Sequence, residues 1–134
     1  MDLGEAVIVA GLGCRKGVSA AQVESAIEAA LAHHRLADHQ LQRIAVPALK
    51  GTEAGVVAAG AARGVPLVLI NQKSLEAASP RTLTRSARSM AAMNVHSVAE
   101  AAALAAGGPN ARLLAPRVAV GPVTCALAEG EAQP

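Results

Sequence analysis

The chain has 134 residues with a formal net charge of +2, and 52% of them are hydrophobic although none is aromatic. This length suits one domain with its own core, and the hydrophobic content excludes a disordered chain. The small net charge and the lack of aromatic side chains for base stacking argue against nucleic-acid binding, and the apolar runs are too short to cross a membrane.

The cysteines and the N-terminus indicate where the protein works. Cys14 and Cys125 show no spacing typical of a disulfide framework or a zinc site, so we expect reduced thiols and neither a bound metal nor a cofactor. Residues 1–5 include acids where a secretory signal would carry positive charge. We therefore expect a cytoplasmic protein.

The first predicted strand covers residues 6–10, and the sequence GLGCRKG at residues 11–17 predicts a turn after it. Its glycines let backbone N–H groups approach a ligand, while Arg15 and Lys16 add positive charge close to the start of a helix capped by Ser19. The segment therefore predicts an anion-binding loop. A plain tight turn explains the same residues, since they fit neither the dinucleotide fingerprint nor the phosphate loop.

Further elements follow in regular alternation. We expect a helix over residues 20–34, a strand over residues 41–47 and a second helix from residue 50 to residue 64. Gly55 and Gly60 each cost roughly 1 kcal/mol relative to alanine inside a helix, so both should lie where it packs tightly.

The middle of the chain predicts one more parallel strand and a basic helix. The apolar run at residues 65–70 is typical of a central parallel strand, and Ser74 is expected to cap a short turn after it. Ser79 and the proline after it predict the start of a helix. One face of this helix would carry three cations, Arg81, Arg85 and Arg88, which either form an ordinary solvated face or bind anionic groups of a substrate.

The last part of the chain predicts a helix and a hairpin. Ser97 and Glu100 form a capping-box pattern that opens an alanine-rich helix, which the glycines at residues 107–108 end. Strands at residues 113–114 and 123–127 are expected to form an antiparallel hairpin at the sheet edge.

Together these elements predict an α/β fold with a single domain over residues 1–128 and a frayed tail over residues 129–134. The expected architecture is a three-layer α/β/α sandwich around a mixed sheet of about five strands, mostly parallel.

Ligands bind such sheets beyond the carboxyl ends of the parallel strands, where residues 11–17, 50–53 and 71–73 should meet. These segments hold four cations and one acid, which favours an acidic ligand. The candidate ligand-binding residues are Gly11, Gly13, Cys14, Arg15, Lys16, Gly17, Lys50, Glu53, Asn71, Lys73 and Ser97.

Some of these residues have a second interpretation. Cys14, next to cations and a helix N-terminus, is either a nucleophile with a lowered thiol pKa or a small packing residue. Lys50 and Glu53 either point together into the cleft, as ligand cation and general base, or form an ordinary first helical turn. Ser97 and Glu100 are explained by the capping box itself.

Three motifs in order resemble a known family. They are GLGCRKG at residues 11–17, KGTEAG at residues 50–55 and NVHSVAEAAAL at residues 94–104. Their order and separations are similar to the CobE/CbiG C-terminal-domain family of cobalamin biosynthesis, and the similarity spans nearly the whole chain. Asn94 stands where the family tends to have glycine, and asparagine tolerates the same left-handed conformation.

The resemblance implies a role in corrin-ring synthesis. The length is similar to the standalone members, which implies a carrier or accessory factor that binds a polycarboxylate precorrin or corrin intermediate in the aerobic pathway. Longer members open a ring lactone of a cobalt-precorrin, and in that alternative Glu53 and Glu100 would be the catalytic acids. A module for small phosphorylated metabolites is a third alternative. Other enzymes of the pathway and a second copy of the chain are the candidate protein partners.

Overall fold

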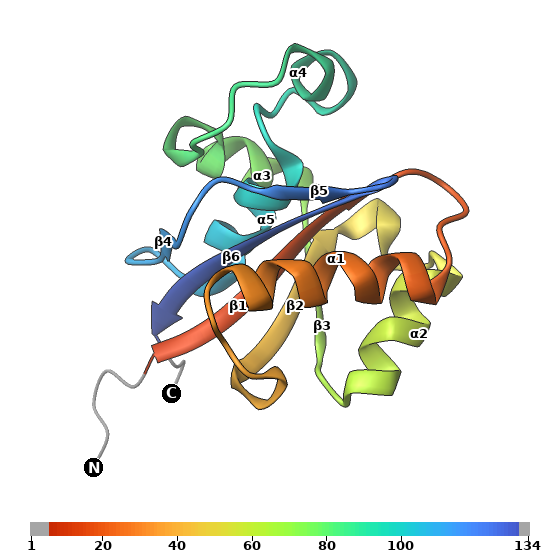
Figure 1. The fold of residues 1–134 in the computed structure, drawn as a ribbon. Coiled ribbons are helices and arrows are strands. Elements are labelled where there is room, and N and C mark those ends of the chain that lie inside the picture. The colour runs from red at the N-terminus through yellow and green to blue at the C-terminus, as the bar shows by residue number, and fades with distance from the viewer. Residues whose placement is uncertain (1–5, 132–134) are drawn as a thin grey trace.

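The computed structural model describes residues 6–131, whose centre is a six-stranded mixed sheet (Figure 1). Its order is β3-β2-β1-β6-β4, and β5 pairs with β6 beside this path. Residues 1–5 and 132–134, which belong to the predicted N-terminus and tail, lie outside the described residues. The strands are β1 (Ala6–Cys14), β2 (Leu41–Pro47), β3 (Leu67–Ile70), β4 (Arg112–Leu113), β5 (Val118–Val120) and β6 (Val123–Glu131).

Helices cover both faces of this sheet. Figure 1 shows α1 (Ala20–His33) and α2 (Ala54–Arg63) on one face, with α3 (Gln72–Ala78) and α5 (Val98–Gly107) on the other. A separate apolar cluster fills each of the two helix–sheet layers. The predicted α/β sandwich with a mixed sheet is therefore confirmed. The remaining helix, α4 (Ala87–Met93), buries none of its residues and projects from the sandwich.

The core is built from aliphatic side chains, many of them alanine. Alternate residues of β1 face opposite layers, so that Ile8 and Leu12 pack under α1 while Val9 packs under α5. Helix α5 buries Ala99, Ala101, Ala102 and Ala103 completely. Small side chains on the helix bring it close to the sheet, in agreement with a core that has no aromatic residue.

Several predicted elements are confirmed. Helix α1 starts with the expected capping box: Ser19 Oγ accepts from the Gln22 N–H at 3.1 Å, and Gln22 Oε1 accepts from the Ser19 N–H at 2.9 Å. Strand β2 has the predicted bounds, and β1, β2 and β3 are parallel.

The prediction that the first strand ends at residue 10 was wrong. Strand β1 continues to Cys14, and Gly11 and Gly13 are paired in it with Ala126 and Thr124 of β6. A Cβ atom placed on Gly11 would lie 2.0 Å from the carbonyl oxygen of Ala99. These glycines therefore mark places where β1 lies close to α5 and to Thr124 of β6, and they do not form a turn.

The predicted antiparallel pairing of the C-terminal strands is confirmed, because β4 and β5 both run antiparallel to β6 and β4 forms an edge of the sheet. Strand β6 lies between β1 and β4, is antiparallel to β1 along its whole length, and runs to Glu131. Residues 129–131 of the predicted frayed tail are thus part of the sheet. Strand β3, expected at the centre, is an edge strand, and its Leu69 is 52% exposed.

Helix α2 begins at Ala54, later than predicted, because a short 3-10 helix, η2 (Ala48–Lys50), comes first. A Cβ on Gly55 would lie 2.2 Å from the carbonyl oxygen of Val18, so the expected tight packing is confirmed there. It was wrong for Gly60, where the nearest atom would be 3.5 Å away.

The predicted helix with three arginines does not form. The chain makes α3, capped by Asn71 in place of the expected Ser74, then one 3-10 turn, η3 (Ser79–Arg81), and leaves the helical path at Thr82. It does so because the N–H groups of Leu83 and Thr84 donate to the carboxylate of Glu100 instead of to the preceding turn. The three arginines therefore lie on separate segments.

Candidate functional site

A cavity of about 360 Å³ lies at the carboxyl ends of β1 and β2. Its walls come from the end of β1, the segment after β2, helix α4, the first turn of α5, the segment before β5 and the β5–β6 turn. The lining residues are Gly13, Cys14, Arg15, Pro47, Lys50, Ser86, Arg88, Ser89, Ala92, Met93, Val98, Arg117, Gly121, Pro122 and Thr124.

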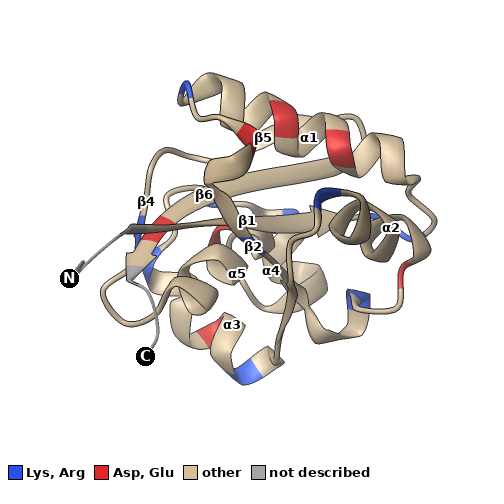
Figure 2. Ribbon diagram, turned by 90° about the horizontal axis from the view of Figure 1, so that it is seen from below, with Lys and Arg blue, Asp and Glu red and all other residues tan. Residues whose placement is uncertain are grey.

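The charge of this cavity is of one sign. Four of its lining residues are cations, Arg15, Lys50, Arg88 and Arg117, and no lining residue is an acid. Each cation comes from a different segment, so the fold gathers them from across the sequence. The two acids of α1, Glu24 and Glu28, do not line the cavity, and both pair with Arg63 of α2 (Figure 2). The arrangement suits a ligand with several negative groups.

The loop after β1 is held by Glu53. Its Oε1 accepts a hydrogen bond from the Gly17 N–H at 3.0 Å, which ties this loop to the start of α2. Gly17 has φ +82°, a left-handed conformation that favours glycine. Neither residue lines the cavity. Glu53 therefore supports the loop that carries Arg15, and its carboxylate already has a partner.

Cys14 lines the cavity but is not an activated thiol. Burial raises the pKa of its thiol, an effect greater than the lowering by the Lys50 charge, and Glu53 raises it further. The alternative of a lowered thiol pKa is contradicted, because Cys14 is the last residue of β1, paired with Val123, and does not lie at a helix N-terminus. The packing interpretation of this residue holds.

Ser97 and Glu100 are both fully buried and lie outside the cavity lining. Ser97 Oγ accepts from the Glu100 N–H at 3.3 Å and caps α5 as predicted. The Glu100 carboxylate serves other segments, accepting from Thr84, Leu83 and Arg117. Burial by itself would raise the pKa of Glu100, but these hydrogen bonds together outweigh it and lower the pKa.

The structure gathers part of the predicted ligand set. Gly13, Cys14, Arg15 and Lys50 line the cavity, whereas Gly11 packs against α5. The others outside the lining are Lys16, Gly17, Glu53, Asn71, Lys73 and Ser97.

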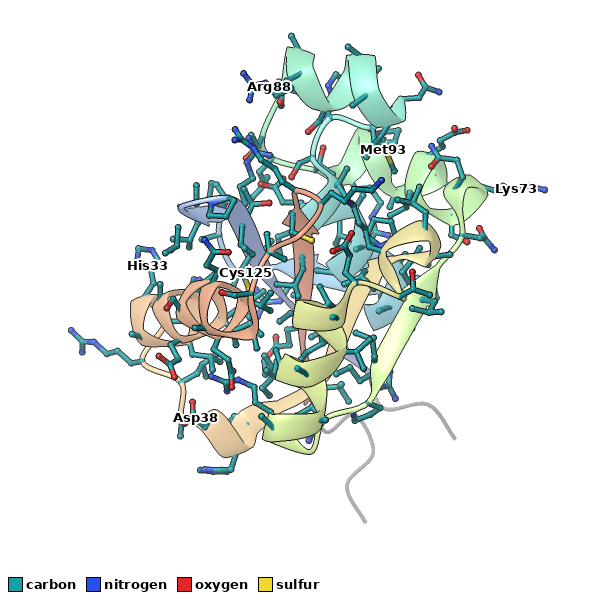
Figure 3. The ribbon with its side chains drawn as sticks, turned by 90° about the vertical axis from the view of Figure 1, so that its right-hand side faces the viewer. His33, Asp38, Lys73, Arg88, Met93 and Cys125 are labelled. Atoms are coloured by element: carbon teal, nitrogen blue, oxygen red, sulfur yellow. The ribbon has the colours of Figure 1, made fainter. Side chains whose placement is uncertain are left out.

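Two of those outside the lining belong to α3. The Asn71 side chain caps this helix by accepting from the Ser74 N–H at 2.8 Å. Lys73 extends away from the molecule in Figure 3. Their distance from the cavity follows from the sheet order, because β3 is the edge strand and β2 separates it from β1.

The predicted ligand set contained neither Arg88 nor Arg117, although binding of anionic substrate groups was the second interpretation of Arg88. Arg88 lies on α4, where a solvated helix face was expected, and Figure 3 shows α4 carrying it beside the end of the sheet. Arg117 lies in the segment between β4 and β5. Neither follows a parallel strand, so the rule that places ligands at strand ends could not find them. The proline-bounded stretch around Arg117 was the one sequence feature that could have indicated a role for this residue.

Two structural properties bear on other kinds of site. None of the helices within residues 6–131 has the length and apolar character needed to cross a bilayer. Within the same residues, no group of three histidine, cysteine, aspartate or glutamate side chains is placed to hold a metal ion.

Fold and site together define an open-sheet α/β domain with a cationic cavity at the carboxyl ends of its parallel strands. The chain belongs to the family described as Cobalamin synthesis G C-terminus, whose sequence model matches residues 8–128. The predicted family is thereby confirmed, and the protein is one of cobalamin biosynthesis.

Individual relatives agree with this assignment. The chain is 32% identical over 121 residues to Protein CobE of Sinorhizobium sp, covering 90% of this chain and 79% of that protein. A crystal structure of CobE, a protein from the cobalamin (vitamin B12) biosynthetic pathway, matches with a TM-score of 0.90 and 29% identity, covering 100% of this chain and 98% of that one.

Two further structures share the fold. Cobalamin biosynthesis protein chiG from Agrobacterium tumefaciens matches with a TM-score of 0.73 and 36% identity over 95% of this chain and 100% of that one. A cobalamin biosynthesis protein G homologue from Sulfolobus solfataricus has the same TM-score of 0.73 at 24% identity, covering 93% of this chain and 37% of that one. At that identity the second match shows the fold only.

Proposed function

We propose that this protein binds a polycarboxylate precorrin or corrin intermediate in the cationic cavity and acts as a carrier or accessory factor in the aerobic pathway. The observation that carries the proposal is the set of four cations, Arg15, Lys50, Arg88 and Arg117, around one cavity without an acid. Intermediates of corrin synthesis carry a rim of acetate and propionate groups, which are charged at neutral pH. Membership of a cobalamin-biosynthesis family supports this choice of anion.

The energetics suit such a ligand. A hydrogen bond to a charged group contributes about 1.5–3 kcal/mol, so three or four carboxylate contacts contribute roughly 5–12 kcal/mol, which is of the same order as the free-energy cost of association. Arg15, Arg88 and Arg117 can each bind a carboxylate with two parallel N–H groups, whereas Lys50 offers a single charged centre. Arginine therefore provides most of the directional recognition.

The size of the cavity indicates how the ring is held. At about 360 Å³ it is much smaller than a tetrapyrrole-derived macrocycle, so it accepts one carboxylate-bearing edge of the ring. Pro47, Met93, Val98 and Pro122 supply aliphatic walls, and the chain has no aromatic side chain for stacking. The rest of the ring then stays outside the cavity, where another enzyme of the pathway can take it.

The test is a titration with coloured ligands. Isolated precorrin intermediates, and uroporphyrin as a stable ring with an acetate and a propionate on every pyrrole, are added to the protein while the visible spectrum is recorded. We expect saturable spectral shifts. Arg88→Ala and Arg117→Ala should each weaken binding by about 1.5–3 kcal/mol, or roughly ten- to hundredfold.

Arg112→Ala is the matched control for these variants. It removes the same charge from β4, where Arg112 pairs with Glu129 at 2.8 Å and does not line the cavity. Its affinity should equal that of the wild type. Absence of a spectral shift with every ring, or equal weakening in all three variants, would overturn the proposal.

The structure does not favour the hydrolase alternative. The two acids named for that chemistry, Glu53 and Glu100, lie outside the cavity lining, and each accepts hydrogen bonds from backbone N–H groups. Binding of inorganic phosphate at low concentration, without binding of any macrocycle, would instead favour the alternative of a phosphorylated metabolite.

A further inference from the structure

We propose that Glu100 is a positioning residue for the binding cavity: its carboxylate fastens the two chain segments that carry Arg88 and Arg117 to the start of α5. The inference rests on the proposed function, because it concerns the cations of that cavity. Glu100 itself does not line the cavity and would not touch the ligand.

One carboxylate holds both segments. Its Oε1 accepts from the N–H groups of Leu83 and Thr84 at 2.6 and 2.9 Å. Its Oε2 accepts from Thr84 Oγ1 at 2.5 Å and from the Arg117 N–H at 2.9 Å. Leu83 and Thr84 precede α4, whereas Arg117 precedes β5, so the Glu100 carboxylate joins two segments that are far apart in the sequence.

Helix α4 depends on such attachments because it buries none of its own residues. Its N-terminal side is held by Glu100 and by the bond from the Ser86 N–H to the His96 carbonyl at 3.1 Å. Its C-terminal end is held by Gln72, whose Nε2 donates to the Met93 carbonyl at 2.6 Å. Arg88 lies in the first turn, so its place in the cavity wall is set mainly by the N-terminal attachment.

The attachment of Arg117 is more direct. Its own N–H donates to Glu100, so the carboxylate fixes the backbone from which the guanidinium extends into the cavity wall. Loss of this bond would release a cation that no regular strand or helix holds, since β5 begins at the following residue.

A carboxylate suits this task better than an amide. It presents acceptors on both oxygens, and all four donors around Glu100 are N–H or O–H groups. In Glu100→Gln one oxygen is replaced by an NH₂ group, which faces a donor and leaves one segment without its bond. The isosteric change therefore disturbs the attachment while it keeps the volume of the buried side chain.

The experiment measures uroporphyrin affinity in a thermodynamic cycle. Glu100→Gln is made in the wild type and in the Arg88→Ala/Arg117→Ala double variant. We expect about tenfold weaker binding in the first background and no further loss in the second, because a positioning residue acts through the cations that it places. A residue needed only for overall folding would weaken binding equally in both.

Two further readouts do not depend on overall stability. The salt dependence of the affinity should be shallower in Glu100→Gln than in the wild type, since fewer charge contacts form. In the ligand-free protein, amide hydrogen exchange should quicken at Leu83, Thr84, Arg117 and in α4, with α1 unchanged. Thr84→Val, which removes only the hydroxyl donor, should weaken binding about threefold and serves if Glu100→Gln does not fold.

The outcomes separate the two proposals. If the wild type binds and the arginine variants bind weakly, but Glu100→Gln and Thr84→Val bind as the wild type, the positioning role is wrong and the proposed function stands. Equal losses in both backgrounds also overturn the positioning role. If the wild type and the arginine variants bind no macrocycle, the proposed function fails and the positioning role fails with it.

Discussion

The contact between Gly11 and α5 depends on the absence of a side chain. A Cβ atom at this position would lie 2.0 Å from the carbonyl oxygen of Ala99 and 2.6 Å from the nitrogen of Ala103. Both are backbone atoms of α5, so only a shift of the α5 or β1 backbone could relieve the clash. At Gly13 the nearest atom would be Thr124 Oγ1 at 2.7 Å, which belongs to a side chain that can rotate.

We therefore expect Gly11→Ala to lower the free energy of unfolding by about 3 kcal/mol and Gly13→Ala by about 1 kcal/mol, because overpacking against backbone is harder to relieve. Urea unfolding of the two variants beside the wild type measures both values. Equal decreases in the free energy of unfolding of the two variants would contradict this reason, because they would mean that the backbone adjusts as easily as a side chain.

The buried carboxylate of Glu100 predicts a dependence of stability on pH. Burial acts to raise its pKa, but the hydrogen bonds from Thr84, Arg117 and Leu83 together bring the pKa below its ordinary value of 4.5. A carboxyl group with a lowered pKa stabilises the fold when ionised, and the contribution is lost as the pH falls through that lowered value.

Wild type should therefore be more stable than Glu100→Gln at neutral pH, and the difference should shrink once the pH falls below 4.5. Urea unfolding of both proteins across a series of acidic buffers gives the two curves. If the stability difference between the two proteins stayed constant down to the acid transition, the ionisation of Glu100 would contribute nothing to stability.

Strand β6 has an unexpected place among the elements. It begins where the second strand of the predicted hairpin was expected and pairs with β4 as predicted, but it also pairs with β1, so it lies inside the sheet. Its last residues pair with the beginning of β1, and Glu129 forms an ion pair with Arg112 at 2.8 Å. The end of β6 therefore pairs with β1 and β4 at the end of the sheet opposite the cavity.

A chain that stops after residue 128 should lose at least about 2 kcal/mol of unfolding free energy, since it lacks three ladder positions of the central strand pair. Arg112→Ala in the full chain removes only the exposed ion pair and should cost less than about 1 kcal/mol. Unfolding in urea compares the three proteins. If the shortened chain were as stable as the full one, residues 129–131 would contribute nothing to stability and the prediction would be wrong.

The alternation of helices and strands was predictable, whereas the order of strands was not. The apolar run of β3 indicates a strand covered by neighbours, but periodicity contains no information about which strand lies at the edge. The segment after η3 shows another limit. Its N–H groups leave the helical pattern for the carboxylate of Glu100, an acceptor that is distant in sequence and arrives only with the tertiary fold.

For the molecule as a whole, the cavity was half predictable. Arg15 and Lys50 follow parallel strands, so the strand-end rule placed them correctly at one edge. Arg88 reaches the same cavity from the short helix α4 and Arg117 reaches it from the segment before β5, and Glu100 holds both segments in place. The glycines of β1 misled the prediction because glycine marks close packing as often as it marks a turn.

The pairing of β1 with β6 also limits how early during synthesis the domain can fold. Ala6 pairs with Glu131 and Cys14 pairs with Val123, so the central pair of the sheet joins the two ends of the described chain. Such contacts between residues far apart in sequence make for a high contact order, which slows folding. During synthesis β1 leaves the ribosome before β6 and cannot pair with it until the residues between them have emerged. The core of the domain therefore forms only after β6 has been synthesised, because the apolar side chains of β1 lack this partner until then.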